Sequence, residues 1–266
     1  MRATDYAGRA VIVTGGTRGI GAEIARAFRR AGAQVLICGR TDPGDVTPLP
    51  KDGRRAARFT RADVRDPDQA RKLVGEAVER FGRLDVMVSN AGGSPSAAAA
   101  TASPRFHAKV IELNLIAPFH VAQSANDVMQ GQQEGGSIIM IGSVSGVRPS
   151  PGTAAYGAAK AGLHHLATSL AVEWAPKVRV NVVVPGPVAT ETAAAAHYAD
   201  VGGPEAVAST VPLGRLAEPG DVADACLFLA SPQAAYVSGA ALTLHGGGER
   251  PAFLAAVQAA VYAPKD

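Results

Sequence analysis

The sequence predicts a single α/β domain in which a parallel sheet is covered by helices on both faces. Three observations support this prediction: short β-branched runs recur along the chain, longer amphipathic stretches separate most of them, and a glycine-rich turn follows the first run. The runs are continuously apolar, which is typical of parallel strands buried on both faces. A chain of 266 residues is also long enough to bury a full core.

Six segments have the composition of buried strands, over residues 10–15, 33–39, 84–90, 137–143, 178–185 and 241–245. Hydrophobic periodicity predicts helices over residues 20–31, 67–81, 105–129, 153–174 and 219–230. Ser103-Pro104 predicts an N-cap followed by a proline in the first turn. The alanine-rich residues 97–102 before it are expected to form a loop. Residues 41–55 contain three prolines and two glycines, which favours a long surface loop over a crossover helix.

Composition excludes several classes of protein. The net charge is +3 and the pI about 9.0, but the basic residues are scattered, so a nucleic-acid partner is not expected. No uncharged apolar run is long enough to span a membrane, and no secretory signal is evident. Cys38 and Cys226 lack the spacing of a metal site or a redox motif, which favours a reducing compartment. We therefore expect a cytoplasmic protein without a bound metal.

The segment "TGGTRGIG", residues 14–21, follows the first strand and opens the first helix. Glycine permits a tight turn and a close backbone approach, and a helix N-terminus offers free N–H groups to phosphates. The spacing is GxxxGxG, and glycines required only for packing remain the alternative. The turn predicts a dinucleotide site formed by Gly15, Thr17, Arg18, Gly19, Ile20 and Gly21.

The end of the second strand bears on which dinucleotide binds. An acidic residue there would bind the ribose 2′-hydroxyl of NAD, but the sequence has Gly39-Arg40. Arg18 and Arg40 suit a 2′-phosphate through charge-assisted hydrogen bonds. The sequence therefore favours NADP(H), with NAD(H) as the alternative if both arginines are only solvated surface residues.

The segment "TAAYGAAKAG", residues 153–162, keeps a phenol and an ammonium four positions apart in a run of small residues. Residues at i and i+4 share one face of a helix, so Tyr156 and Lys160 are expected to lie together. Taken alone, such a pair is more often packing plus a solvated cation.

Several motifs occur in the order and spacing of a known family: "VIVTGGTRGIG", "LDVMVSNAG", "ELNLIAPF", "IIMIGSVSG", "AAYGAAKAG" and "VRVNVVVPGPVATET". With them, the chain resembles the short-chain dehydrogenase/reductase family, in the group that includes the 3-oxoacyl carrier-protein reductases. The resemblance implies one doubly wound Rossmann-type domain with a seven-stranded parallel sheet over residues 1–248, and a C-terminal extension over residues 249–266. It also implies a homotetramer.

The resemblance assigns roles to individual positions. Asn114, Ser143, Tyr156 and Lys160 match the family's catalytic tetrad. The matching cofactor contacts are Asp63 and Val64 at the adenine, Asn90, Ala91 and Gly92 in the cleft, Tyr156 and Lys160 at the nicotinamide ribose, and Pro185, Gly186, Val188 and Thr190 around the nicotinamide. Thr190 also suits an N-cap of the helix that follows it.

These residue types suit the reduction of a carbonyl, which needs a hydride on carbon and a proton on oxygen. The nicotinamide supplies the hydride, and Tyr156 supplies the proton. A tyrosine pKa near 10 is high for this task, so Lys160 is expected to lower it. Ser143 would donate a hydrogen bond to the substrate oxygen, and Asn114 would hold a water that connects Lys160 to solvent.

The composition of one segment bears on the substrate. Residues 190–216 are expected to form the substrate lid, and their small apolar composition favours a hydrophobic ketone or secondary alcohol: a 3-oxoacyl thioester, an alicyclic ketone or a steroid-like ring. Phe253, Leu254, Val257 and Val261 predict an amphipathic helix in the extension. The alternatives are an NAD(H)-dependent alcohol dehydrogenase of the same family and a nucleotide-sensing protein with this fold but no turnover.

Overall fold

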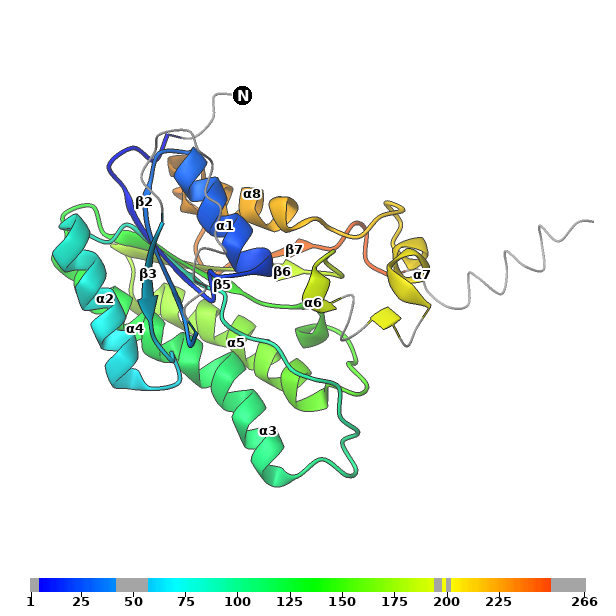
Figure 1. The fold of residues 1–266 in the computed structure, drawn as a ribbon. Helices are drawn as coiled ribbons and strands as arrows, with labels where there is room; N and C mark the ends of the chain where they lie inside the picture. The colour runs from blue at the N-terminus through cyan, green and yellow to red at the C-terminus, as the bar shows by residue number, and fades with distance from the viewer. Residues whose placement is uncertain (1–4, 42–56, 194–197, 200–201, 250–266) are drawn as a thin grey trace, which may run out of the picture.

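The computed structural model describes residues 5–41, 57–193, 198–199 and 202–249, and its sheet has seven parallel strands (Figure 1). The strands are β1 (Ala10–Thr14), β2 (Gln34–Gly39), β3 (Arg58–Arg61), β4 (Val86–Ser89), β5 (Gly136–Ile141), β6 (Val178–Pro185) and β7 (Ala241–Leu244), in the order β3-β2-β1-β4-β5-β6-β7. The order reverses between β1 and β4, and ligands of such sheets bind at this point. The predicted doubly wound α/β fold is confirmed.

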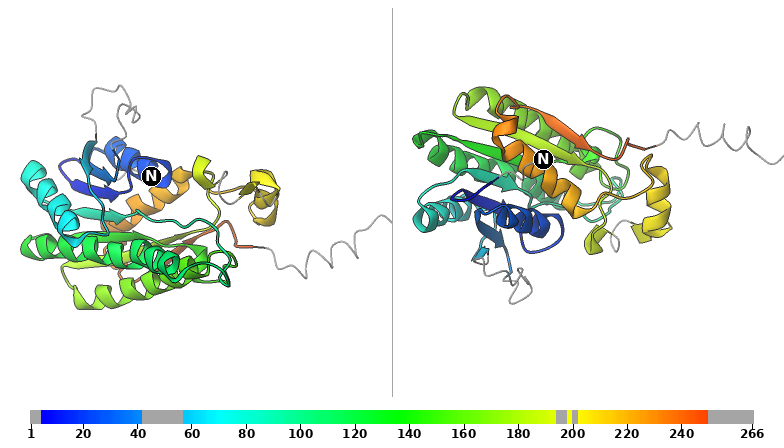
Figure 2. Two further views of the ribbon diagram at one scale, coloured as in Figure 1. Left: turned by 60° about the horizontal axis from the view of Figure 1, so that its bottom comes forward. Right: turned by 90° about the horizontal axis from the view of Figure 1, so that it is seen from above.

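Helices cover both faces of the sheet, as Figure 2 shows. One layer contains α1 (Gly19–Arg30) and α8 (Pro219–Ala230), which pack against each other. The other contains α2 (Pro67–Phe81), α4 (Ala117–Gly131) and α5 (Ala154–Glu173). Each layer buries its own apolar cluster against the sheet, so the strands are apolar on both faces.

The sequence did not single out β3. Its residues read Arg-Phe-Thr-Arg, and the strand pairs only with β2 at the edge of the sheet, where burial does not demand a continuous apolar run. The predicted loop before β3 lies mostly outside the described residues, as does nearly all of the predicted C-terminal extension and its helix.

A second difference concerns the helix predicted over residues 105–129. The structure has α3 (Pro104–Ile111), a π-helical turn (Glu112–Ile116) and then α4. The predicted N-cap is confirmed, because the Ser103 Oγ accepts from the Phe106 N–H at 3.2 Å. The alanines before it lie in a loop, as predicted. The π turn places an extra residue in the helix at Asn114, and such turns often occur at functional sites.

A charged cluster joins β1 and β4 at their amino ends. The Asp85 carboxylate is 7% exposed and accepts hydrogen bonds from Arg83 at 2.6 Å, Arg9 at 2.7 Å and the Ala10 N–H at 2.8 Å. Burial raises the pKa of Asp85, but these hydrogen bonds outweigh burial and lower the pKa below its ordinary value. The cluster lies at the opposite end of the sheet from the loops described next.

No helix in the described part of the chain combines the length and apolarity needed to span a bilayer.

Candidate active site

Most of the predicted site residues lie in loops that follow the carboxyl ends of the strands. The glycine turn follows β1, Asn90 follows β4, Ser143 follows β5, and β6 ends at Pro185. Because parallel strands end at one edge of the sheet, the fold brings these loops together although they are far apart in sequence.

The glycine turn requires glycine for two reasons, backbone conformation and space. Gly15 and Gly19 have φ values of +63° and +54°, which side chains rarely adopt. Gly21 is required for space, since a Cβ there would lie 2.3 Å from the Asn90 Nδ2 and 2.4 Å from the Gly15 carbonyl oxygen. The turn opens α1 at Gly19, and the N-cap residue Arg18 makes no side-chain cap bond. The first N–H groups of the helix are thus left for a ligand.

Asn90 connects the ends of β1 and β4. Its Nδ2 donates to the Thr14 carbonyl at 3.0 Å and to the Gly15 carbonyl at 3.2 Å. In return, the Thr14 Oγ1 accepts from the N–H groups of Asn90 and Ala91, both at 3.0 Å. The sequence analysis missed Thr14, although a hydroxyl that ends an apolar strand before a glycine turn was a usable signal.

Tyr156 and Lys160 share one face of the first turns of α5, as their spacing predicts. The Lys160 Nζ lies 5.6 Å from the centroid of the Tyr156 ring and donates to the Ile141 carbonyl at 2.8 Å. Lys160 is 4% exposed, so its ammonium lies against the end of β5 and not in solvent.

The electrostatics of this pair differ from the prediction. Burial raises the pKa of the Tyr156 phenol, and a side-chain hydrogen bond with Ser143 only partly opposes this. Burial also lowers the pKa of Lys160 to about 8. The prediction that Lys160 lowers the tyrosine pKa is therefore wrong for the protein alone, because loss of water disfavours the charged form of both groups.

Ser143 is held in place through its backbone and its side chain. Its Oγ accepts from the Ser145 N–H at 3.1 Å and so caps the short 3₁₀ helix Val144–Gly146. Its N–H donates to the His164 Nε2 at 3.4 Å.

His164 is a second residue that the sequence analysis did not assign to the site. It follows Lys160 by one helical turn on the same face of α5. Gly142 leaves room for the imidazole, since a Cβ there would lie 2.3 Å from the Nε2. Burial, followed by the Lys160 charge, lowers the pKa of His164, which favours the neutral imidazole that can accept from Ser143.

Asn114 is fully buried in the π-helical turn, and its amide is already bonded to the protein. The Oδ1 accepts from the Gly93 N–H at 2.8 Å, and the Nδ2 donates to the carbonyls of Gly93 and Val110, both at 2.9 Å. A Cβ on Gly92 would lie 2.8 Å from the Asn114 Oδ1 and 3.4 Å from the Lys160 Nζ. The structure thus brings Asn114 and Lys160 together at Gly92.

The residues predicted at the adenosine differ in accessibility. Arg18 and Arg40 are exposed, and a Cβ on Gly39 would lie 3.2 Å from the Thr17 methyl group. Asp63 forms a hydrogen-bonded ion pair with Arg65. The hydrogen bond from Arg65 is the main cause of the lowered pKa of Asp63. The Val64 side chain is 5% exposed and belongs to the core, so it offers little surface to a ligand.

The segment after β6 crosses toward the glycine turn. Val188 is buried and forms an isolated bridge with Ala217. The Thr190 Oγ1 accepts from the Ala193 N–H at 3.1 Å, which confirms the predicted cap of α6 (Glu191–Ala193). A Cβ on Gly19 would lie 3.8 Å from the Thr190 methyl group, so this segment faces the start of α1.

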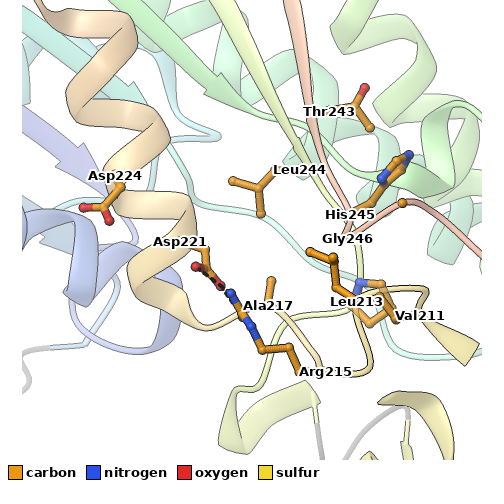
Figure 3. A pocket seen from close by; sticks show the side chains of 12 residues that line it. Val211, Leu213, Arg215, Ala217, Asp221, Asp224, Thr243, Leu244, His245 and Gly246 are labelled. Atoms are coloured by element: carbon orange, nitrogen blue, oxygen red, sulfur yellow. Dashed lines mark hydrogen bonds and ion pairs between the residues drawn. The ribbon is translucent and has the colours of Figure 1, made fainter. Parts of the chain in front are cut away.

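A cavity of about 450 Å³ lies beside the predicted lid, between the end of β7, the segment after α7 (Gly203–Thr210) and the start of α8 (Figure 3). Arg215 and Asp221 form an ion pair at 2.6 Å in its wall, and His245 lies across from them. None of the predicted tetrad lines this cavity. A much smaller hollow, formed by Ser94, Gly152 and their neighbours, adjoins Tyr156.

The chain is similar to known oxidoreductases along most of its length. The family model described as enoyl-(acyl carrier protein) reductase matches residues 15–249. The L-rhamnose 1-dehydrogenase (NAD(P)(+)) of Azotobacter vinelandii is 38% identical over 90% of this chain and 96% of that protein. The cis-4-hydroxycyclohexanecarboxylate dehydrogenase of Sinomonas cyclohexanicum is 38% identical over 91% of this chain and 97% of that protein.

Among solved structures, the aldohexose dehydrogenase of Thermoplasma acidophilum superimposes with a TM-score of 0.84 at 28% identity, over 92% of this chain and 95% of that one. The similarity to these proteins, in sequence and in fold, therefore extends over nearly the whole chain. The protein belongs to the short-chain dehydrogenase/reductase family of oxidoreductases.

Proposed function

We propose that this protein interconverts a secondary alcohol and a ketone with a nicotinamide dinucleotide, and that Tyr156 transfers the proton. The observation that carries the proposal is the position of the Tyr156 ring, 5.6 Å from the buried Lys160 ammonium. The Ser143 side chain also acts on the pKa of the Tyr156 phenol. These three residues occupy the edge of the sheet that also holds the glycine turn.

Each residue has a role that its surroundings support. A bound NADP(H) would exchange the hydride with the substrate carbon. The raised pKa of Tyr156 keeps the phenol protonated, which suits a proton donor to a developing alkoxide. The Ser143 hydroxyl would donate a hydrogen bond to the same oxygen, and Asn114 orders the backbone beside Lys160 and has an acceptor lone pair left for a water.

We infer a preference for NADP(H) over NAD(H). The exposed Arg40 directly follows β2, where an NAD-selective site would present a carboxylate. The exposed Arg18 follows Thr17, whose methyl group would lie 3.2 Å from a Cβ on Gly39. The positive field of Arg40 reaches Asp63, whose pKa it helps to lower. NAD(H) remains the alternative to be tested, because the name of one relative includes NAD(P)(+).

A comparison of NADPH and NADH tests this preference. We expect a kcat/KM at least about 10-fold higher with NADPH, and we expect Arg40→Ala to reduce this ratio by removing a charge-assisted bond to the 2′-phosphate. Equal use of both cofactors by the unmodified protein would overturn the preference for NADP(H). It would not contradict the proposed interconversion of an alcohol and a ketone.

For the substrate we propose an alcohol on a ring, in preference to an acyl thioester. The relatives compared above have a sugar or a hydroxylated cyclohexane in their names. Helix α7, in the described part of the lid, has mostly small side chains. A panel of cyclic alcohols, steroids and acyl thioesters, followed by nicotinamide absorbance, tests this choice. Faster turnover of the thioesters would contradict it.

We also propose that the protein is a cytoplasmic homotetramer. Support for assembly comes from apolar side chains left on helix surfaces, including Val172 on α5 at 78% exposed and Phe228 on α8 at 42%. The two buried, unpaired cysteines suit a reducing compartment. Light scattering after gel filtration should give about four times the mass of one chain, and a monomer would reject the assembly.

A further inference from the structure

An ion pair joins the loops that follow β5 and β7. The Arg148 Nη2 lies 2.6 Å from the Glu249 Oε1. These two strands are not neighbours, because β6 lies between them in the sheet. The pair therefore connects across the carboxyl end of β6, where Pro185 and Gly186 begin the segment that crosses toward the glycine turn.

The Arg148 side of this pair is held by two hydrogen bonds. Arg148 lies in the loop between Ser143 and Tyr156. Its N–H donates to the Val144 carbonyl at 3.1 Å, and its Nη1 donates to the Pro149 carbonyl at 2.9 Å. The backbone of Arg148 is thus held by the short turn that Ser143 caps, and its guanidinium by the carbonyl of the next residue.

The Glu249 side is held much less firmly. Glu249 follows three consecutive glycines, Gly246, Gly247 and Gly248, whose φ values are +61°, +96° and +88°. Arg148 is 38% exposed and Glu249 is 45% exposed. An exposed ion pair of this kind contributes at most about 1 kcal/mol, so another carboxylate can take the place of Glu249 at little cost.

We propose that Arg148 binds a carboxylate carried by the substrate, and that Glu249 occupies this position until the substrate replaces it. This inference rests on the proposed function, whose substrate class it narrows to ring alcohols that bear a carboxylate. The planar guanidinium has a fork of donors that matches a carboxylate, and one arm already points at the carboxylate of Glu249. Glu249 is then an internal competitor of acidic substrates.

A pair of substrates that differ only in charge tests the proposal. The probes are 4-hydroxycyclohexanecarboxylate and its uncharged amide. With Arg148→Met we expect the KM of the acid to rise about fivefold, the size of an exposed charge pair, while the KM of the amide stays within about twofold. With Glu249→Gln we expect the KM of the acid to fall up to about fivefold, because the competitor is gone.

A matched control separates recognition from a general effect of losing an arginine. Arg71→Met removes a more exposed ion pair with Asp68 on α2, and we expect it to leave both KM values unchanged. If Arg148→Met changes the acid and the amide alike, or if Glu249→Gln raises the KM of the acid, the proposal is overturned.

Binding of cyclohexanecarboxylate, which has no hydroxyl to react, keeps the test independent of turnover. Calorimetry with NADP⁺ present should detect binding by the unmodified protein, weaker binding by Arg148→Met and tighter binding by Glu249→Gln. If binding follows this pattern but neither alcohol is oxidised, the carboxylate site stands and the proposed ring-alcohol activity falls. Equal binding by the unmodified protein and Arg148→Met rejects the site itself.

Discussion

The ammonium of Lys160 donates to the carbonyl oxygen of Ile141 at 2.8 Å, inside the protein and two residues before Ser143. This bond connects the first turns of α5 to the end of β5. It therefore links the helix that carries Tyr156 to the strand that precedes Ser143. Holding an ammonium there has an energetic cost, which is visible as the lowered pKa of Lys160.

The first prediction is a pH-dependent stability difference between the unmodified protein and Lys160→Met. The Lys160 pKa is about 8 in the folded protein and about 10.4 in an unfolded chain, so between these values the unfolded state binds more protons. Stability of the unmodified protein, relative to the variant, should therefore rise by about 3 kcal/mol from pH 8 to above pH 10. Below pH 8 the difference should be constant.

Urea unfolding followed by circular dichroism measures this difference across the pH range. Lys72→Met, at an exposed position of α2, serves as the control for the loss of a lysine. A flat curve for Lys160→Met would contradict the burial of its ammonium.

The second prediction concerns the phenol of Tyr156. Tyr156→Phe keeps the ring but removes the proton that the substrate oxygen needs, so kcat should fall by at least about 100-fold. The dissociation constant of NADPH, measured by fluorescence, should change little. Tyr236→Phe alters a fully exposed ring and should leave kcat unchanged. Undiminished turnover by Tyr156→Phe would reject the tyrosine as the proton donor.

The third prediction uses the close approach at the glycine turn. In Gly21→Ala the new methyl group meets the Asn90 amide at 2.3 Å and the Gly15 carbonyl at 2.4 Å, so the turn must shift. We expect a loss of about 1–3 kcal/mol in the free energy of unfolding and at least about 10-fold weaker NADPH binding.

Gly75→Ala is the matched control for this change. A Cβ at Gly75, within α2, meets nothing within 4 Å, so the substitution should stabilise the protein by about 0.5–1 kcal/mol and leave NADPH binding unchanged. Similar effects of both alanines would show that the turn tolerates a side chain.

The fourth prediction separates stability from activity at the amino end of the sheet. Asp85→Asn removes the charge that Arg83 and Arg9 share, and because both arginines are partly exposed we expect a loss of about 2 kcal/mol. Activity of the folded variant should be unchanged, since the cluster lies at the opposite end of the strands from Tyr156.

The pH dependence of this loss has a definite sign. The folded pKa of Asp85 lies below its ordinary value, so its stabilisation is complete above about pH 4 and is lost as the pH falls through the folded pKa. The gap between the unmodified protein and Asp85→Asn should therefore narrow in acid. Asp68→Asn, in an exposed pair, should cost under about 0.5 kcal/mol at any pH. A gap that widens on acidification would exclude this role for Asp85.

The sequence by itself determined the fold class, the main helices and six of the seven strands. Buried parallel strands need continuous apolar runs, and covering helices need a 3.6-residue period, so both leave a local record in the chain. The spacing of Tyr156 and Lys160 predicted their shared helical face for the same reason, and the glycine turn was recognisable because left-handed residues such as Gly15 and Gly19 require glycine.

Only the tertiary structure decided how these groups act on one another. The edge strand β3 lacks an apolar run, and the π turn at Asn114 is a one-residue irregularity inside a helical pattern, so neither has a strong local signal. The direction of the Tyr156 pKa, the His164 contact with Ser143 and the Arg148–Glu249 pair depend on burial and on contacts between segments far apart in the chain. Desolvation and long-range contact are properties of the packed molecule, and no spacing along the chain encodes them.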